Sequence, residues 1–560
     1  MNSTPRRLAI AALALFSSIN VTAQVLAVDP SKMTALGTVD GRFQSYNIEM
    51  VEVTGGRFWK PYSSQAHTTG QQAPKPQAAA PIAGLGSDLF EYRPPIDLSN
   101  SRLRKLAAAL GPAYVRVSGS WANSVYFQDS DDAAPATPPS GFGSVLTRKQ
   151  WKGVIDFARA GDAQLVTSFA ISPGTRNADG QWTPEQAGKV LAYTKSLGGQ
   201  IAAAEFMNEP NLPSFGGAPK GYDAAAYARD LAIFKPFLKQ NSPETLLTGP
   251  GSTAETPDRT RSPIPGFLTT DALLTATGPA FDIFDYHLYA AVSQRCAQRA
   301  PVGGTSESDA LSAEWLSRSE KIAAYYAGLR DKYEPGKPIW ITETADAACG
   351  GNPWASTFLD TFRYLVQHGR LAQMGVKVIM HNTLAASDYG LLDEKTFTPR
   401  PNYWAALLWR KLMGSTVLDP HVAALDRVVP SASADSRPAT AGVPVSSFAQ
   451  QLRSPEAQQL VFTFAHCLQG HPGGVALLLI NPDQQRTYEL NLPSDAERYT
   501  LTAEHLEDKT VLLNGKPLAL RSGDELPELN GEGIQAGKLA VHPRSITFLA
   551  IADANNNACK

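Results

Sequence analysis

The sequence has little charge and no large excess of either sign. Of its 560 residues, 18% are Asp, Glu, Lys or Arg, and the formal net charge is −2. Such a chain offers no basic field for nucleic acid and no polybasic face for a membrane surface. Its hydrophobic content of 43% is typical of a folded globular protein rather than a disordered one. We therefore expect a folded protein with no nucleic-acid partner.

Long apolar runs are also missing. The apolar run Leu8 to Phe16 follows two arginines and is too short to span a bilayer. Small-residue cleavage sites follow at Val21-Thr22-Ala23 and Val25-Leu26-Ala27, a pattern typical of a secretory leader. The alternative is a buried first helix. We expect residues 1–27 to be a signal peptide, and the protein to be secreted or periplasmic with no membrane span.

Cysteine is scarce. The four cysteines are Cys296, Cys349, Cys467 and Cys559, which allow three disulfide pairings. The first two each lie a few residues beyond a predicted strand end, and the last two both lie in the C-terminal part. An exported chain can form disulfides. We therefore favour Cys296–Cys349 and Cys467–Cys559, and free buried thiols are the alternative.

No Gly-rich phosphate loop follows any predicted strand, which disfavours a doubly wound nucleotide-binding sheet. Short apolar runs instead alternate with amphipathic runs of helical spacing, as in repeated βα units. Eight such units predict an α/β fold, a (β/α)₈ TIM barrel over residues 46–414. The predicted strands are Tyr46–Val53, Ala113–Val117, Gln164–Ser172, Ile201–Met207, Thr245–Thr248, Phe281–Tyr289, Pro338–Thr342 and Lys377–Thr383.

Two connections in the barrel are unusually long, and the pattern changes after the barrel. Thr54–Pro95 and Asp129–Gly141 would lie over the site and wall it. From residue 415 to 560, short strand-like runs and the turn Asn514-Gly515 predict a C-terminal β-sandwich. A strand within residues 28–45 is expected to join the sandwich.

Two carboxylates stand where a barrel enzyme places its chemistry. Asn208-Glu209-Pro210 follows the fourth predicted strand, and Glu343 follows the seventh. Strand ends in these positions project into one mouth. Retaining glycosidases need two carboxyl groups about 5–5.5 Å apart, one ionised and one protonated. Either motif alone is commonly a plain turn, so the pair carries the prediction.

Three further side chains stand near predicted strand ends and suit that chemistry. Arg116 could keep a nucleophilic carboxylate ionised, and a hydroxyl from Tyr289 could bond to it. His287 lies near the end of the same predicted strand as Tyr289. Each alone is more simply explained as a structural ion pair, a rim aromatic or a satisfied core histidine. Together they favour a catalytic site.

Six runs carry a resemblance to a known family. They are Met207-Asn208-Glu209-Pro210-Asn211, Asp285-Tyr286-His287-Leu288-Tyr289, Trp340-Ile341-Thr342-Glu343-Thr344, Met374-Gly375-Val376-Lys377-Val378-Ile379-Met380, Tyr389-Gly390-Leu391-Leu392-Asp393-Glu394 and Pro401-Asn402-Tyr403-Trp404. In this order they resemble the heparanase-like β-glucuronidases, family 79 of the glycoside hydrolases. The resemblance covers the barrel and extends plausibly into the sandwich.

The resemblance implies a retaining hydrolase of β-linked glucuronides that uses no metal or other cofactor. It makes Glu209 the acid/base and Glu343 the nucleophile, with Asn208 on the 2-hydroxyl of the sugar. It implies that the Gly350-Gly351 backbone and Tyr389 hold the uronate carboxylate. The positions at which the family contacts sugar hydroxyls are Glu49, Ser120 and, more weakly, Asn382.

The chain also departs from the family pattern. Animal heparanases carry an acidic chain on basic clusters beside the cleft, whereas here the loops supply scattered arginines: Arg259, Arg261, Arg295 and Arg299. We therefore expect an exo-acting or short-oligosaccharide β-glucuronidase. The alternatives are an endo-β-glucuronidase, a barrel glycosidase of another sugar specificity, and a non-catalytic glycan-binding protein. The sequence leaves the oligomeric state open.

Overall fold

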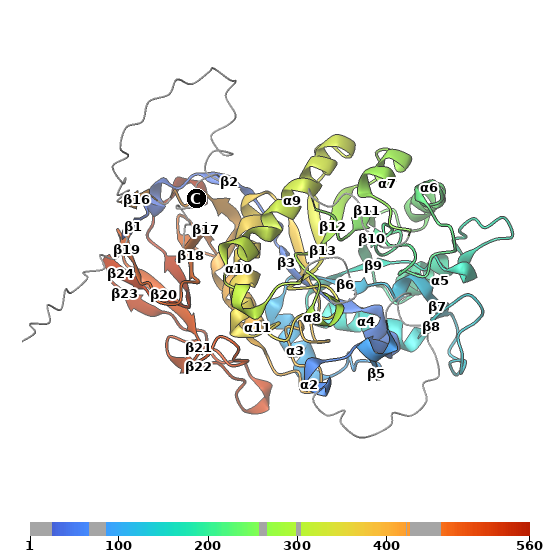
Figure 1. The fold of residues 1–560 in the computed structure, drawn as a ribbon, viewed down its shortest axis with the longest axis horizontal. Coiled ribbons are helices and arrows are strands. Elements are labelled where there is room, and N and C mark those ends of the chain that lie inside the picture. Colours follow the sequence, from blue (N-terminus) through green and yellow to red (C-terminus); the bar gives the residue numbers. More distant parts are fainter. Residues whose placement is uncertain (1–24, 66–85, 257–265, 298–303, 422, 426–460) are drawn as a thin grey trace, which may run out of the picture.

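The centre of the molecule is a closed barrel of parallel strands (Figure 1). The computed structural model describes residues 25–65, 86–256, 266–297, 304–421, 423–425 and 461–560. Most of the expected leader lies outside these ranges, as do Arg259, Arg261 and Arg299. The barrel strands are β3 (Gln44–Glu49), β6 (Ala113–Ser118), β9 (Ala163–Ser168), β10 (Ile201–Glu205), β11 (Leu246–Ser252), β12 (Ile283–Tyr289), β13 (Ile339–Ala345) and β14 (Val378–His381).

The strands follow one another around the barrel in chain order, and β14 closes the ring by pairing with β3. All eight strands lie where the sequence predicts them, with ends that differ by a few residues. β13 continues past Thr342, so Glu343 lies inside the strand and not after it. The first strand is shorter than predicted. Residues Met50–Thr54 form helix α1, because Glu49 and Glu52 make a reciprocal capping box there.

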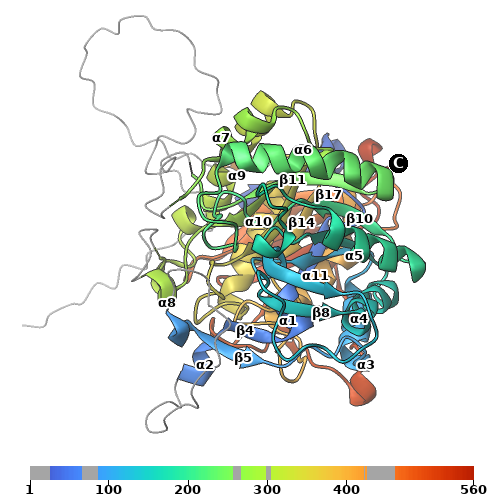
Figure 2. The ribbon, with the colours of Figure 1, turned by 90° about the vertical axis from the view of Figure 1, so that its right-hand side faces the viewer.

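Helices cover the barrel, and Figure 2 shows α3, α4, α5 and α6 following one another around the strands. They are α3 (Ser101–Leu110), α4 (Arg148–Ala160), α5 (Glu185–Ser196), α6 (Ala224–Asn241), α7 (Thr270–Thr277), α9 (Ala313–Tyr333), α10 (Phe358–Gln373) and α11 (Pro401–Leu412). Side chains of Asn100, Thr147 and Asp223 cap three of them. α5 differs, because its cap position is Pro184 and makes no side-chain bond.

Two β-sheets form the sandwich beside the barrel. One has the order β16-β1-β19-β24, and the other has the order β2-β15-β17-β18-β25-β20-β21-β22, with β23 on β20. Figure 1 shows the blue strands β1 and β2 lying among the red C-terminal strands. The bounds are β1 (Val25–Ala27), β2 (Ala35–Thr38), β15 (Met413–Leu418), β16 (Ala423–Leu425), β17 (Phe462–Leu468), β18 (Val475–Asn481), β19 (Tyr488–Leu492), β20 (Ala496–Thr502), β21 (Leu512–Leu513), β22 (Lys516–Pro517), β23 (Glu532–Ile534), β24 (Gly537–Val541) and β25 (Ser545–Ile551).

The central strands of the larger sheet are buried on both faces, which explains why β18 is almost entirely apolar. Leu477 and Leu479 pack in the core between the two sheets, whereas Leu478 and Ile480 pack in the core shared with the barrel. Neighbouring residues of a strand point to opposite faces, so both sets must be apolar. Gly369 of α10 allows the close approach, since a Cβ there would lie 2.3 Å from the Phe464 ring. The fold is therefore a (β/α)₈ barrel with a C-terminal β-sandwich.

The first long connection contains regular structure. Strands β4 (Gly56–Trp59) and β5 (Phe90–Arg93) pair antiparallel, and the short helix α2 (Tyr62–Gln65) follows β4. The second connection lies between β7 (Val125–Gln128) and β8 (Ser144–Thr147), which pair with each other. Within the described part of the chain, no helix is both long and apolar enough to cross a membrane.

Candidate active site

Glu209 is placed by the chain that leaves β10. The side chain of Asn123 holds the backbone of Asn208 from both sides: its Nδ2 donates to the carbonyl at 2.8 Å, and its Oδ1 accepts the N–H at 2.8 Å. The next residue, Glu209, has a positive φ of 47°, which is uncommon for a residue other than glycine. The clamp therefore fixes a sharp turn at Glu209. Its side chain is 14% exposed.

Glu343 projects from β13 into a ring of hydrogen-bond donors. Arg116 donates through Nη1 to Oε2 at 2.9 Å, and the Tyr289 hydroxyl donates to Oε1 at 2.5 Å. Asn382 approaches Oε1 from the other side, with its Nδ2 at 3.4 Å. A carboxylate that accepts charge-assisted bonds of this kind is held in its ionised form.

The two carboxyl groups face each other. One oxygen of Glu209, one oxygen of Glu343 and a ring nitrogen of His287 all lie within 4.8 Å of one another. Three such groups could also hold a metal ion, and they are the one cluster of this kind among the described residues. The environments of the two carboxyl groups differ, because Arg116 and Tyr289 bond to Glu343 and not to Glu209.

A second buried glutamate anchors Arg116, and the sequence analysis gave it no role. Glu205, the last residue of β10, accepts Nε and Nη2 of Arg116 at 2.9 and 2.8 Å. Burial opposes the ionised form of Glu205, but the charge of Arg116 and hydrogen bonds lower its pKa to about 2. The signal was a charged residue that ends an apolar strand, because buried charges need a partner.

Arg116 also orients Asn208. Its Nη2 donates to Asn208 Oδ1 at 2.7 Å, which leaves the Asn208 amide NH₂ free to face Ser120, 3.5 Å away. Arg116 is therefore a hub: one guanidinium group fixes Glu205, Glu343 and Asn208 at once. This planar, five-donor geometry is available from arginine and not from lysine.

His287 connects the two carboxyl groups from β12. Its Nδ1 lies 2.9 Å from Glu209 Oε1 and 3.6 Å from Glu343 Oε2. Burial lowers the pKa of His287, but the negative charge of Glu343 and the contacts with Glu205 and Glu209 raise it to about 10. Its other ring nitrogen, Nε2, lies 3.2 Å from Arg116 Nη2 and 4.0 Å from Glu205 Oε1.

The surroundings of Glu209 help this carboxyl group to hold a proton. Burial raises its pKa above the ordinary value, against the lowering effect of its bond to His287. The charge of Glu343 raises it further. A raised pKa is what a carboxyl group needs in order to act as a general acid.

Glu49 and Tyr389 complete the floor beside Glu343. Asn382 Nδ2 lies 3.0 Å from Glu49 Oε1 and 3.2 Å from the Tyr389 hydroxyl. The other oxygen of Glu49 is buried without a hydrogen-bond partner among the described atoms, and burial raises the pKa of this group well above its usual range. Position 119 must be a glycine to leave room for the Glu49 side chain, since a Cβ on Gly119 would lie 1.6 Å from Glu49 Oε2.

The Gly350-Gly351 pair lies on the same side as Tyr389. A Cβ on Gly351 would lie 3.1 Å from the Tyr389 Cβ, and a Cβ on Gly350 would lie 2.5 Å from the Trp59 Cβ. Both glycines have positive φ values, of 80° and 84°. The hydroxyl of Tyr389 is in turn bonded to Asn382, whose Nδ2 also faces Glu343. The glycine pair therefore lies on the Tyr389 side of the two facing carboxyl groups.

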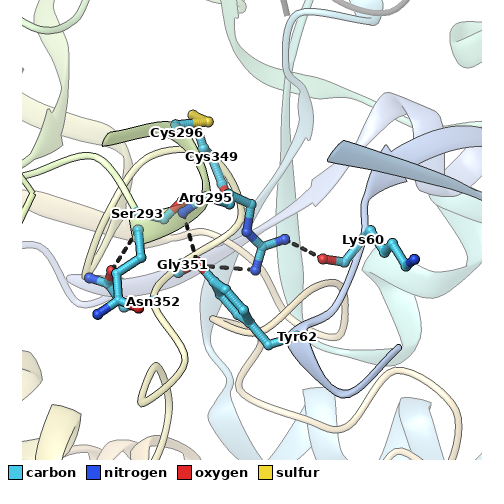
Figure 3. Close-up of a disulfide and its surroundings, with 9 residues drawn as sticks. Lys60, Tyr62, Ser293, Arg295, Cys296, Cys349, Gly351 and Asn352 are labelled. Carbon is cyan, nitrogen blue, oxygen red and sulfur yellow. Dashed lines mark hydrogen bonds between the residues drawn. A yellow bond between two sulfur atoms is a disulfide. The ribbon is translucent and has the colours of Figure 1, made fainter. Parts of the chain in front are cut away.

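The β4–β5 hairpin closes this side of the mouth. Arg295 donates to the backbone carbonyl of Lys60 and pairs with Asp388, and its guanidinium lies 4.0 Å from the centre of the Tyr62 ring (Figure 3). Arg295 is thus buried in a structural contact and is not displayed to solvent. Arg93 of β5 pairs with Glu394 in the loop after β14. The hairpin is therefore tied to the loops after β12 and β14.

The structure joins Cys296 to Cys349 and Cys467 to Cys559, the two pairings that the sequence favours. No cysteine is free among the described residues. The first disulfide links the short helix α8 (Gln294–Ala297) to the loop that carries the glycine pair (Figure 3). The second links β17 to the C-terminal end of the described chain.

A (β/α)₈ barrel with two opposed carboxyl groups, at the carboxyl ends of its fourth and seventh strands, is the arrangement of a glycoside hydrolase. No family model matches the chain. Heparanase-like protein 1 of Arabidopsis thaliana is 26% identical over 528 residues, covering 83% of this chain and 86% of the relative. Hyaluronoglucuronidase of Hirudo nipponia is 25% identical over 500 residues, covering 83% and 92%. The relatives include inactive heparanase-2 of Mus musculus, 26% identical over 435 residues, covering 74% and 66%.

A solved structure agrees with this fold. A 4-O-α-L-rhamnosyl-β-D-glucuronidase from Fusarium oxysporum has a TM-score of 0.58 at 14% identity, covering 94% of this chain and 100% of the other. That likeness shows the fold. Together with the sequence relatives, it confirms the resemblance of this chain to the heparanase-like β-glucuronidases of glycoside hydrolase family 79.

Proposed function

We propose that the protein is a retaining β-glucuronidase that releases β-linked glucuronic acid from glycans or glucuronides. The observation that carries the proposal is the pair of carboxyl oxygens of Glu209 and Glu343, which lie within 4.8 Å in environments of opposite kind. Retaining glycosidases bring these groups to about 5–5.5 Å, and inverting ones leave room for water at about 6.5–9.5 Å.

The reaction is a double displacement. Glu343, hydrogen-bonded to Arg116 and Tyr289, attacks the anomeric carbon, while Glu209 gives its proton to the leaving oxygen. The bond between sugar and aglycone breaks, and a glycosyl ester of Glu343 forms. Glu209, now ionised, then takes a proton from water, which attacks the anomeric carbon and frees Glu343. His287 steadies Glu209 in both forms through Nδ1.

The sugar ring is positioned by four polar side chains around the carboxyl pair. Asn208 faces the mouth with its amide donors and would bind the 2-hydroxyl. The unpartnered oxygen of Glu49 is a natural contact for another hydroxyl, because a buried polar atom without a partner costs free energy. Ser120 and Asn382 lie beside these two groups.

Specificity for a uronic acid is supported by the glycine pair and by the relatives. Glycine lets backbone N–H groups approach an anion closely, and Tyr389 supplies a hydroxyl beside them. Hyaluronoglucuronidase of Hirudo nipponia is among the sequence relatives. We propose that the Gly350 and Gly351 N–H groups and Tyr389 hold the substrate carboxylate. The resemblance implies no metal, so we expect a chelator such as EDTA to leave turnover unchanged.

Exo action on a terminal sugar, or on a short oligosaccharide, is supported by the β4–β5 hairpin. The hairpin packs against Gly350 through Trp59 and is tied to two neighbouring loops. We expect it to limit the space for a longer glycan on the uronate side. The two disulfides and the leader-like N-terminus support export. Assays of defined glucuronide oligomers by product length test this part, and internal cleavage products contradict it.

The catalytic assignment is tested with Glu343→Gln and Glu209→Gln. Each is expected to lower kcat on a chromogenic β-glucuronide by at least about 10²–10⁴-fold while the thermal unfolding curve is kept. For Glu209→Gln the loss is expected to be smallest with an aglycone that leaves without a proton. Near-wild-type turnover in either variant would refute the assignment.

Two competing functions are separated by substrate and by labelling. If a panel of chromogenic glycosides shows turnover of β-xyloside or α-arabinofuranoside and none of β-glucuronide, the uronate assignment is wrong. A non-catalytic glycan-binding protein, as the inactive relative suggests, would bind without hydrolysis. Here Glu209, Glu343 and their partners are all present, and a covalent glucuronide-type inhibitor is expected to label Glu343 in peptide maps.

A further inference from the structure

The loop after β13 has an unusual backbone that the proposed mechanism uses but does not explain. Cys349, Gly350 and Gly351 follow one another with φ values of 65°, 80° and 84°. Glycine adopts such φ values at little cost, but a residue with a side chain, such as Cys349, does so only where the surroundings impose it. The question is which groups do so.

Two buried serine hydroxyls hold the carbonyl groups of this segment. Ser293 Oγ donates to the carbonyl of Cys349 at 3.1 Å, and Ser387 Oγ donates to the carbonyl of Gly350 at 3.0 Å. Both serines are at most 1% exposed. In a trans peptide the C=O and the following N–H point in opposite directions. The hydroxyls therefore fix the N–H groups of Gly350 and Gly351 on the sides that face away from the two serines.

Those two N–H groups have no acceptor of their own. Gly350 and Gly351 are buried, yet among the described residues neither N–H donates a hydrogen bond. Buried backbone donors are almost always paired, so a pair left open is a place for a ligand. The neighbouring N–H, that of Asn352, is by contrast bound to Asp346 Oδ2 at 3.0 Å. The open donors are confined to the two glycines.

Covalent and ionic contacts brace both serines. The Cys296–Cys349 disulfide, with a Cα–Cα distance of 6.4 Å, ties the loop to the segment that carries Ser293 (Figure 3). Ser387 has a φ of 65° itself, and its N–H donates to Glu394 Oε2 at 3.2 Å. Glu394 in turn pairs with Arg93 of the β4–β5 hairpin. Segments from four parts of the chain thus converge on two peptide groups.

We propose that Ser293, Ser387 and the Cys296–Cys349 disulfide are positioning elements that preorganise the Gly350 and Gly351 N–H groups as a receptor for the substrate carboxylate. This inference rests on the proposed function. The two serines do not touch the sugar. They hold the N–H donors in place before the ligand binds, so binding does not have to order the loop. Selectivity for an acidic sugar then depends on the hydroxyl groups of Ser293 and Ser387, which do not contact the substrate.

The test compares an acid with its neutral ester. Phenyl 1-thio-β-D-glucuronide and its methyl ester are used as competitive inhibitors of the wild type and of Ser293→Ala/Ser387→Ala. Removing the two hydroxyl groups that bond to the carbonyls of Cys349 and Gly350 is expected to weaken inhibition by the acid about 10-fold or more. Inhibition by the ester is expected to change less than about threefold. Ser545→Ala is the matched control, because its buried hydroxyl also donates to a carbonyl, that of His542, but in the sandwich.

A second pair of variants tests the disulfide. Cys296→Ala/Cys349→Ala is expected to show the same selective loss toward the acid, with kcat on a chromogenic glucuronide nearly kept and KM raised. Cys467→Ala/Cys559→Ala removes the other disulfide and is expected to leave the ratio of the two inhibition constants unchanged. If it shifts the ratio equally, the first disulfide acts through general stability and the inference is overturned.

The possible outcomes distinguish a failure of the positioning proposal from a failure of the proposed function. If the wild type does not prefer the acid over the ester, the uronate-binding proposal itself fails. If the wild type prefers the acid and the serine and disulfide variants keep that preference, the positioning proposal fails and the function stands. A parallel loss toward acid and ester in the serine variant also overturns it, since that is the mark of a structural defect.

Discussion

The two ends of the barrel are built from the same strands but from opposite kinds of side chain. At the amino ends, Tyr114, Val166, Ala203, Ile283, Trp340, Val378 and Met380 form an apolar cluster. Two positions further along three of these strands stand Arg116, Glu205 and Asp285. Because residues two apart in a strand share a face, one apolar layer directly underlies a layer of buried charge.

The difference shows what each layer does. A cavity of about 450 Å³ opens at the amino end, where Trp340 and Tyr114 are among its lining residues. It contains none of the paired carboxylates, so its size alone does not mark a site. In the charged layer Arg116 pairs with Glu205, whereas Asp285 accepts a bond from Thr248 through Oδ2 and its Oδ1 has no partner among the described atoms. Burying such groups costs stability, and it holds Arg116 in place beside the two facing carboxyl groups. Stability and catalysis are therefore expected to separate between the two layers.

The largest expected effect comes from breaking the charged layer. Glu205→Gln removes one of the two buried carboxylates that pair with Arg116 and is expected to lower the free energy of unfolding by about 3–5 kcal/mol. Turnover should fall as well, because Arg116 then no longer holds Glu343 and Asn208 in register. Urea unfolding and steady-state kinetics measure the two effects.

The amino end provides the contrast. Met380→Ala removes buried apolar volume and is expected to cost about 2–5 kcal/mol of stability. kcat/KM at a temperature where the variant is folded should stay within about twofold of wild type. A comparable loss of turnover in Met380→Ala would show that the two layers are not separable.

The loss of folding stability at low pH should also come from the charged layer. The pKa of Glu205 is about 2 when folded, below its ordinary value of 4.5. A depressed folded pKa contributes stability at pH values above 4.5, and this contribution is lost as the pH falls from 4.5 toward 2. Unfolding free energies at pH 5, 4 and 3 should fall less steeply for Glu205→Gln than for the wild type. Met380→Ala should keep the wild-type slope, and equal slopes for all three would contradict this.

A smaller effect is expected at the nucleophile. Tyr289→Phe removes the hydroxyl that donates to Glu343 Oε1 at 2.5 Å, and a hydrogen bond to a charged group is worth about 1.5–3 kcal/mol. kcat/KM is expected to fall about 10–100-fold with the fold intact. Tyr286→Phe is the control on the same strand, because the buried hydroxyl of Tyr286 has no partner among the described atoms. A similar loss in both variants would point to strand packing.

The smallest effect is a shift of the pH profile. Glu209 must carry a proton to act as the acid, so activity falls as pH rises through its pKa. The bond and charge of His287 lower that pKa against the effect of burial. His287→Gln keeps a side-chain donor but loses the charge, so the alkaline limb of kcat/KM is expected to move to higher pH. If the alkaline limb of the kcat/KM profile stays in place or moves to lower pH, His287 does not set the pKa of Glu209.

The sequence indicated much of this site because the relevant signals are local. Apolar runs with strand and helix periods predicted all eight βα units, and a carboxylate near a strand end is visible in Met207-Asn208-Glu209-Pro210 and in Ile341-Thr342-Glu343. The errors were local as well. Tyr46–Val53 was expected to be one strand, but Glu49 and Glu52 cap a helix there, since Met50, Val51 and Val53 also fit a helical face.

The role of Glu205 could not be predicted in the same way. It is the last residue of an apolar strand, and only the closed barrel brings it to Arg116, 89 residues earlier. The same holds for Arg295, which looked like a free charge near the cleft and is instead buried against Tyr62 and Asp388. Whether a charged side chain is exposed to solvent or paired in the interior depends on partners that are distant in sequence.

The sequence by itself determined where strands, helices and turns form and which residue types stand at the strand ends, because those choices depend on the spacing of apolar side chains and on local capping. The tertiary structure alone decided which carboxyl groups face each other, which of them contact Arg116 and which backbone donors stay open. Those features depend on burial and on groups a few ångströms away, and barrel closure is what brings those groups together.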